Sequence, residues 1–173
     1  MRVIIEKGRH YPFPYFGIYM PILTRKDRYF KKRKSFEFTM SCIYDLKDDN
    51  QHDVNKLFGF SVGFHHKNSF RFGWRPSADL TKIEIVGYEY RNGVRTPTLP
   101  ICEVDVYKSY TFQIRYVPGF SVIQYSVCDD DNGLIGIAQS QITLKKKYNW
   151  GYKLGLYFGG NEKAPHDIII YKK

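Results

Sequence analysis

"LFGFSVGFHHKNSFRFGWRP", residues 57–76, alternates between two kinds of side chain in the way that a β-strand alternates between its two faces. One set is bulky and apolar: Phe58, Phe60, Val62 and Phe64. The other set, Leu57, Gly59, Ser61, Gly63 and His65, is small between its leucine and its histidine. We therefore expect the apolar set to point into a core. We expect the small residues to leave room on the outer face of the sheet for a ligand.

The same period of two runs through most of the chain. It recurs in residues 35–44, 69–75, 82–90, 110–116, 121–127, 133–144, 152–158 and 167–173. Asn92-Gly93 and Asp131-Asn132-Gly133 supply the positive backbone dihedrals that tight hairpins require. No segment has the period of a long amphipathic helix, and no repeat or linker divides the chain. The pattern predicts an all-β fold, an antiparallel two-sheet β-sandwich, as a single domain over residues 1–173.

Positive charge is concentrated in one segment. The chain has a net charge of +10, and residues 25–34 contribute +6 of it through seven Lys or Arg and one Asp. We expect this segment to be a solvated loop, and docking of an acidic partner stays open as an alternative. Nucleic acid is disfavoured as a partner, because no stacking platform of aromatic residues follows Tyr29 and Phe30.

Several classes of protein are disfavoured by what the sequence lacks. Cys42, Cys102 and Cys128 show no CxxC spacing and are expected to be buried thiols in a reducing compartment, with one disulfide as the alternative. No apolar run is long enough for a membrane span or for the core of a signal peptide. A cytoplasmic location is therefore expected for the sequence as it stands, and an extracytoplasmic one if the natural chain begins earlier. The oligomeric state is left open.

No metal site and no cofactor are expected. His65 and His66 are adjacent on the predicted strand and would point to opposite faces, so they could not easily share a metal ion. Asp129 and Asp131 lie in a hairpin signal that lacks the distant Glu of a calcium loop.

Applying one parity to every strand gives a candidate ligand-binding surface on the concave sheet. Its members carry charge or hydrogen-bonding groups: His65, Arg71, Arg75, Gln113, Arg115, Lys153 and Tyr157. Such a surface suits an elongated, polar and anionic ligand. Assigning these residues to one sheet is an assumption, because parity gives the face of a strand and not the sheet that it joins.

The stretch "WGYKLGLYFGGN" (150–161) resembles the late strand of concanavalin-like jelly rolls, especially polysaccharide lyases of the alginate-lyase and heparin-lyase kind. The resemblance implies a concanavalin-like jelly roll. The blocks "NKLFGFSVGFHHKNSFRFGWR" and "YFGGNEKAPHDI" also resemble a group of bacterial proteins of the Bacteroides type.

In such lyases an Arg and an amide neutralise a uronate carboxylate, a His or Tyr removes the neighbouring proton, and a Tyr protonates the leaving oxygen. The resemblance implies these roles here for Arg71 or Arg115, with Gln113, His65 and Tyr157 as the remaining members. The chain lacks the Arg-rich early motif and the Gln-Ile-His triplet of those lyases.

The leading functional prediction is therefore a carbohydrate-binding module for an anionic polysaccharide or oligosaccharide. The first alternative is a lyase that acts on uronates by β-elimination through His65, Arg71 and Tyr157. The second is a protein-interaction or structural module without a small ligand.

Overall fold

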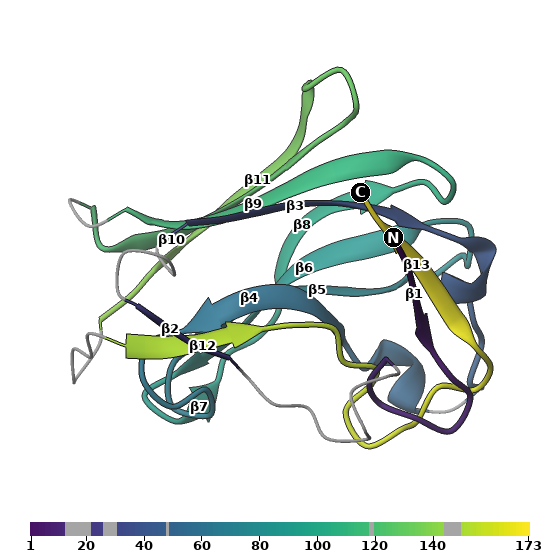
Figure 1. Ribbon diagram of the computed structural model, residues 1–173, viewed down its shortest axis with the longest axis horizontal. Coiled ribbons are helices and arrows are strands. Elements are labelled where there is room, and N and C mark those ends of the chain that lie inside the picture. Colours follow the sequence, from purple (N-terminus) through teal and green to yellow (C-terminus); the bar gives the residue numbers. More distant parts are fainter. Residues whose placement is uncertain (13–21, 26–30, 48, 118–119, 144–149) are drawn as a thin grey trace.

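Two antiparallel sheets face each other in the computed structural model, which describes residues 1–12, 22–25, 31–47, 49–117, 120–143 and 150–173 (Figure 1). One sheet has six strands in the order β1 (Arg2–Ile5), β13 (Ile168–Lys172), β3 (Lys31–Phe38), β9 (Ser109–Val117), β10 (Val122–Cys128) and β11 (Leu134–Gln141). The other has seven: β2 (Ile22–Arg25), β12 (Trp150–Leu154), β4 (Asn55–Ser61), β5 (Ser69–Pro76), β6 (Ile83–Arg91) and β7 (Val94–Arg95), with β8 (Leu99–Val104) also paired to β6.

Every strand pairing between these elements is antiparallel, and the expected all-β sandwich is confirmed. Two short 3₁₀ turns, Met40–Cys42 and Asp49–His52, lie between β3 and β4. Within the described ranges, no helix is long and apolar enough to cross a membrane.

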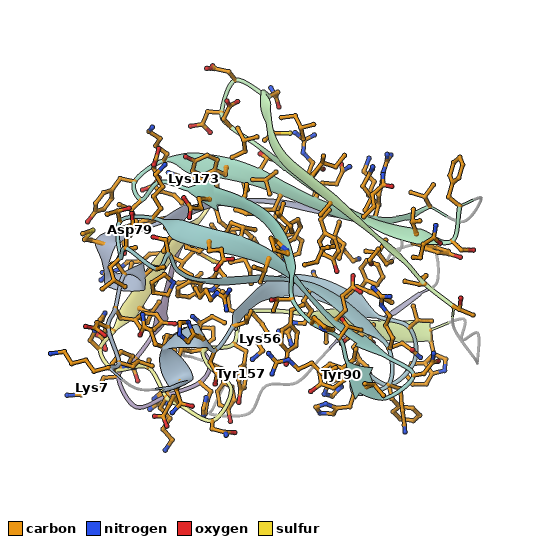
Figure 2. The ribbon with its side chains drawn as sticks, turned by 180° about the vertical axis from the view of Figure 1, so that it is seen from behind. Lys7, Lys56, Asp79, Tyr90, Tyr157 and Lys173 are labelled. Carbon is orange, nitrogen blue, oxygen red and sulfur yellow. The ribbon has the colours of Figure 1, made fainter. Side chains whose placement is uncertain are left out.

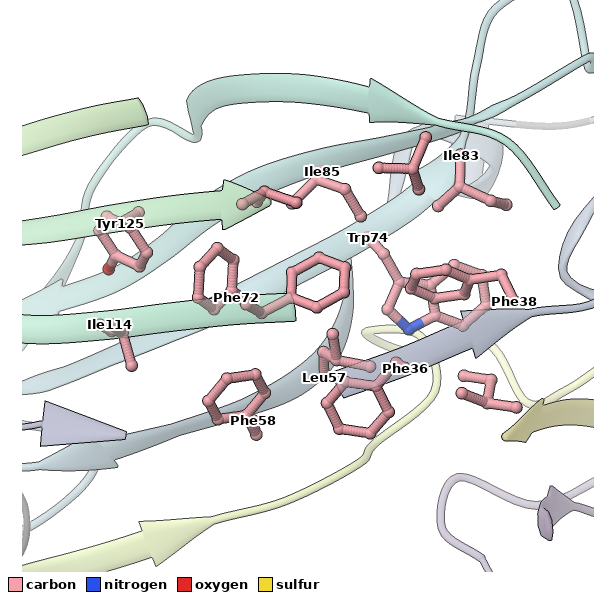
Figure 3. Packing of buried hydrophobic residues seen from close by; sticks show 14 of the residues in the cluster. Phe36, Phe38, Leu57, Phe58, Phe72, Trp74, Ile83, Ile85, Ile114 and Tyr125 are labelled. Carbon is pink, nitrogen blue, oxygen red and sulfur yellow. The ribbon is translucent and has the colours of Figure 1, made fainter. Parts of the chain in front are cut away.

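The core lies between the sheets and is rich in aromatic rings (Figure 3). Phe72 and Trp74 of β5 point inward and are fully buried. Phe72 packs edge-on against Phe112 and Tyr125 of the six-stranded sheet, with ring centroids 5.4 and 5.2 Å away. Edge-to-face packing of this kind stabilises aromatic pairs beyond the burial of their area. These contacts hold the two sheets in a fixed relation.

A buried carboxylate links the sheets at one end of this core. Glu89 of β6 is 1% exposed, and its Oε1 accepts hydrogen bonds from the Tyr125 hydroxyl at 2.9 Å and the Ser140 hydroxyl at 2.6 Å. Arg91 donates to the other oxygen and forms an ion pair with it. Burial, and then the Glu89 charge, raise the pKa of Tyr125 well above its ordinary value. The carboxylate is therefore fully engaged in holding the sandwich together.

The alternation in residues 57–64 is kept only in part. Phe58 and Phe60 point into the core as predicted, but Leu57 is buried there too, because the pairing register of β4 with β5 shifts between Lys56 and Phe58. Phe64 was predicted to point inward, and that prediction is wrong: β4 ends at Ser61, and the Phe64 side chain is 56% exposed.

The small outward residues of β4 were expected to leave room for a ligand, but they have another structural role. A Cβ added at Gly59 would overlap the carbonyl oxygen of Phe70 in β5, and one added at Gly151 in β12 would overlap that of Ser61. The Ser61 hydroxyl donates to the Gly63 carbonyl and accepts from the Tyr152 amide. These small residues permit close approach of neighbouring backbones, so they do not form an open floor for a ligand.

Candidate functional site

Charged and aromatic side chains gather on the outer face of the seven-stranded sheet. β4 is arched, and this face lies on the inside of the arch (Figure 1). The basic–aromatic cluster, as we call it, consists of Lys56, Arg71, Tyr88, Arg95 and Tyr157. Lys56, Arg71 and Tyr88 face outward, as their partners on the neighbouring strands show. Lys56 lies opposite Gly73, and Arg71 lies opposite both Gly59 and Tyr88.

Lys56 lies at the centre of this cluster and is only 7% exposed. Its ammonium donates to the Gly159 carbonyl at 2.6 Å, and it lies 4.8 Å from the ring centroid of Tyr88 and 5.3 Å from that of Tyr157. Figure 2 shows Lys56 and Tyr157 next to each other at the lower side of the molecule. Arg95, an exposed residue of β7, lies over the Tyr88 ring at 5.2 Å. Two cations therefore share one aromatic ring, an arrangement that cation–π attraction favours.

The charge of Lys56 is held in an unfavourable environment. Burial, and then Arg71 and Arg95, lower its pKa to about 7, and the carboxylate that opposes this effect is that of Asp53. A buried ammonium beside other cations loses its proton more easily because both desolvation and repulsion disfavour the charged form. At neutral pH this lysine therefore exchanges between its charged and uncharged forms.

Tyr157 reaches this face because the chain leaves the sheet and returns to it. β12 ends at Leu154, and the backbone rejoins β4 through the two hydrogen bonds between Lys56 and Tyr157. Arg71, which is 9% exposed, donates to the carbonyl of Gly155, which lies between the end of β12 and Tyr157. On the other side His10 stacks on Tyr157, with ring centroids 5.1 Å apart and an interplanar angle of 10°. Burial, and then Tyr11, raise the pKa of Tyr157, while Arg71 opposes them.

Aromatic rings continue from this cluster along the same face. Tyr90 lies 6.0 Å from Tyr88, and His66 lies 6.0 Å from Tyr90. The contacts then pass to His65, Tyr152, Trp150 and Phe64 at successive centroid distances of 4.1, 5.8, 5.7 and 5.2 Å. We call this series, from Tyr88 to Phe64, the aromatic track.

His65 belongs to this track but not to a strand. It lies in the turn that joins β4 to β5, since β4 ends at Ser61, so the expectation that His65 and His66 point to opposite faces of a strand is wrong. Burial lowers the pKa of His65, and His66 and Arg71 lower it further. The histidine is therefore kept mainly in its neutral form near neutral pH.

The other predicted site residues lie in three different places. Arg75 shares the outer face but forms an ion pair with Glu84 and donates to the His52 carbonyl. Lys153 was assigned outward, yet it lies opposite the inward-facing Phe60 and so belongs to the inner side of β12. Gln113 and Arg115 lie on β9 in the six-stranded sheet, where Arg115 donates to Gln124. Of the seven predicted residues, His65, Arg71, Arg75 and Tyr157 are on the outer face of the seven-stranded sheet.

Sequence reasoning missed Lys56, Arg95 and His10. The register shift after Lys56 breaks the alternation there and hides its outward direction. His10 and Arg95 come from a loop and from a two-residue strand, where no period exists to be detected. Tyr88 lies in the regular strand β6, and its ring lies beside both Lys56 and Arg95 in the cluster.

Other candidate chemistry is explained by local structure. In the part of the chain that the structure describes, no group of three His, Cys, Asp or Glu is positioned to hold a metal ion. Asp129 accepts a hydrogen bond from the Gly133 amide at 2.7 Å and so closes the β10–β11 hairpin. The three cysteines are free thiols, and burial raises the pKa of Cys42 to about 12.

Comparison with known proteins supports the fold. No protein-family model matches the chain, and no curated protein matches it. Among solved structures, the winged bean acidic lectin in complex with methyl-α-D-galactose aligns with a TM-score of 0.52 at 13% identity, over 88% of this chain and 69% of the lectin. A functionally unknown protein from Saccharomyces cerevisiae aligns with a TM-score of 0.53 at 12% identity, over 99% of this chain and 86% of that one. The expected resemblance to Bacteroides-type proteins finds no support among them, whereas the two-sheet sandwich of concanavalin-like lectins is confirmed as the fold of this chain.

Proposed function

We propose that the outer face of the seven-stranded sheet binds an anionic oligosaccharide. The basic–aromatic cluster would hold an acidic group of the ligand, and the aromatic track would hold its sugar rings. The observation that carries the proposal is the nearly buried ammonium of Lys56 beside Arg71 and Arg95.

Bringing these cations together disfavours the charged form of Lys56, and a carboxylate or sulfate of a ligand would reverse that effect. Charge-assisted hydrogen bonds to an oxyanion are about twice as strong as neutral ones. Groups with perturbed pKa values gather at functional sites more often than elsewhere, because their environment is built for a charged or reacting ligand. The cluster therefore suits an acidic group better than a neutral one.

The aromatic track supports the sugar part of the proposal. Aromatic faces carry partial negative charge and attract the weakly positive C–H groups of a pyranose ring. The lectin neighbour is described in complex with a galactoside, but a shared fold supports many functions and contributes only analogy. The elongated row of rings from Tyr88 to Phe64 favours an extended ligand.

Calorimetric titration with acidic and neutral oligosaccharides of equal length, at constant ionic strength, tests this proposal. We expect the acidic series to bind and Arg95→Ala to weaken binding by roughly two- to fivefold, as for one exposed charge contact. Arg115→Ala is the matched control, since Arg115 is also exposed but lies on the other sheet. Equal affinity for neutral sugars would refute the anionic part. No binding by either series would leave the interaction module as the better interpretation.

A uronate lyase is the second candidate, and the charge of Arg71 is the observation that favours it. After burial and His66, Arg71 lowers the pKa of His65 further, and it opposes the rise in the pKa of Tyr157 that burial and Tyr11 cause. A neutral histidine could take the proton beside the uronate carboxylate while a protonated tyrosine gives one to the leaving glycosidic oxygen. The carbon–oxygen bond would break as a carbon–carbon double bond forms, so that no further reactant is needed.

The unsaturated product absorbs ultraviolet light, which separates the two candidates. Product that appears with wild type and disappears in both His65→Ala and Tyr157→Phe would establish the lyase. Binding without any increase in absorbance would reject the lyase and keep the binding proposal.

A further inference from the structure

The inner side of β3 changes character along its length. Phe36 and Phe38 point into the core, and Lys34 and Lys32 follow them with the same parity. In the register, Lys34 lies opposite Phe112 and Lys32 opposite Ile114, both of which are fully buried. The two lysines therefore point toward the opposite sheet and not toward the solvent outside.

Two further lysines from other strands lie on the same inner side as Lys34. Lys172 of β13 lies opposite Phe36, and Lys153 of β12 lies opposite the inward-facing Phe60. The Lys34 ammonium is 5.0 Å from the ring centroid of Phe58, which shares the inner face of β4 with Phe60. Lys34, Lys153 and Lys172 thus come from both sheets, and we call them the inter-sheet lysine cluster.

These three ammonium groups are not neutralised by carboxylates of the described residues. Within the ranges that the structure describes, none of the three forms an ion pair. Burial, and then Lys172, Lys153 and Lys32, lower the pKa of Lys34 to about 8. Repulsion between like charges in a partly dry environment is strong, because water screens it poorly there. An anion bound between the ammonium groups would remove that repulsion.

We propose that the inter-sheet lysine cluster binds a compact oxyanion, a sulfate or phosphate group, at a site separate from the outer face. Three point charges converging from two sheets suit a small anion with several oxygens, since each ammonium can donate to a different oxygen. The Phe58 ring, with its centroid 5.0 Å from the Lys34 ammonium, is an apolar neighbour of the cluster. This site does not depend on the proposed sugar-binding function.

Thermal unfolding in low-millimolar sodium sulfate or phosphate, against sodium chloride of equal ionic strength, tests the site. These concentrations are far below those at which such salts stabilise proteins in general by exclusion from their surface. Anion at about a hundred times its Kd would raise the Tm of a chain of this size by roughly 5–10 °C. We expect a saturable increase of that order in the wild type. Glucose 6-sulfate in place of the inorganic ion distinguishes a free anion from one carried on a sugar, and a saturable increase with either that Lys34→Met abolishes supports the site.

Two variants make the result specific. Lys34→Met is expected to raise the Tm in sodium chloride, because it removes a repelled charge, and to abolish the further increase caused by sulfate. Lys163→Met, at an exposed lysine outside both proposed sites, is expected to keep that increase. Lys153→Gln repeats the test at an exposed position if Lys34→Met does not fold. A sulfate-dependent increase that survives in Lys34→Met or Lys153→Gln, or its absence in the wild type, would overturn the proposal.

Discussion

Replacing Lys56 with methionine should stabilise the protein at acidic pH and lose this effect at alkaline pH. Methionine has nearly the length of the lysine stem and a thioether that packs well on aromatic rings, so the contacts with Tyr88 and Tyr157 are largely kept. What the substitution removes is the ammonium group and its hydrogen bond to the Gly159 carbonyl.

The magnitude follows from the pKa of Lys56, which is about 7 in the folded state against 10.5 for an unperturbed lysine. Between these values the unfolded chain binds more protons than the folded one, so the free energy of unfolding of the wild type rises with pH. The interval of about 3.5 units, at about 1.36 kcal/mol per unit, means that below about pH 7 the charge destabilises the fold by roughly 5 kcal/mol. Loss of the hydrogen bond to Gly159 costs about 1 kcal/mol in the variant.

Urea denaturation of wild type and variant across this pH range measures the difference directly. At about pH 6 we expect Lys56→Met to be roughly 3–4 kcal/mol more stable, and at about pH 10 we expect the difference to fall close to zero. Lys163→Met serves as the control, because Lys163 is exposed and its replacement should leave stability unchanged at both pH values. A stability difference for Lys56→Met that is constant with pH would refute the claim that the folded protein disfavours the charged form of this lysine.

Two further substitutions test the framework on which the site is built. Glu89→Gln should destabilise the protein by about 2–4 kcal/mol in urea denaturation, because Arg91, Tyr125 and Ser140 all donate to this buried carboxylate; a loss below that of Tyr125→Phe, about 1 kcal/mol, would contradict its linking role. Gly151→Ala should cost about 1–3 kcal/mol by the same measurement, because the new methyl group would overlap the Ser61 carbonyl oxygen, and an unchanged midpoint would show that β12 can move away from β4 freely.

The strands could be predicted from the sequence because burial on one face imposes a period of two that few other structures share. Residues 69–75 show this plainly: Phe70, Phe72 and Trp74 are all fully buried, as their spacing predicts. Sheet membership could not be predicted in the same way. Arg71 and Arg115 have the same outward pattern in their strands, yet they lie on opposite sheets, since parity contains no information on which strands pair.

The candidate site was harder to predict because it depends on departures from regular strands. The register shift beside Lys56 turns this residue outward, between its two inward neighbours Asn55 and Leu57. Lys153 faces inward within β12, and the break after Leu154 changes the parity of the chain so that Tyr157 reaches the outer face. A local irregularity of one residue changes which face every later side chain meets.

Stability and binding measured together on Lys56→Met decide why the charge is kept. A group that destabilises the fold persists in a protein where function needs it, since most stabilising substitutions at functional sites reduce activity. If the ammonium serves an anionic ligand, the variant must gain stability at about pH 6 and lose affinity for acidic oligosaccharides. In the wild type, that affinity should also fall as the pH rises through about 7, because the anion binds the protonated lysine and bound anion would raise its pKa. A variant that gains stability and keeps full affinity would separate the two effects, and the acidic group would then have to be held by Arg71 and Arg95 alone.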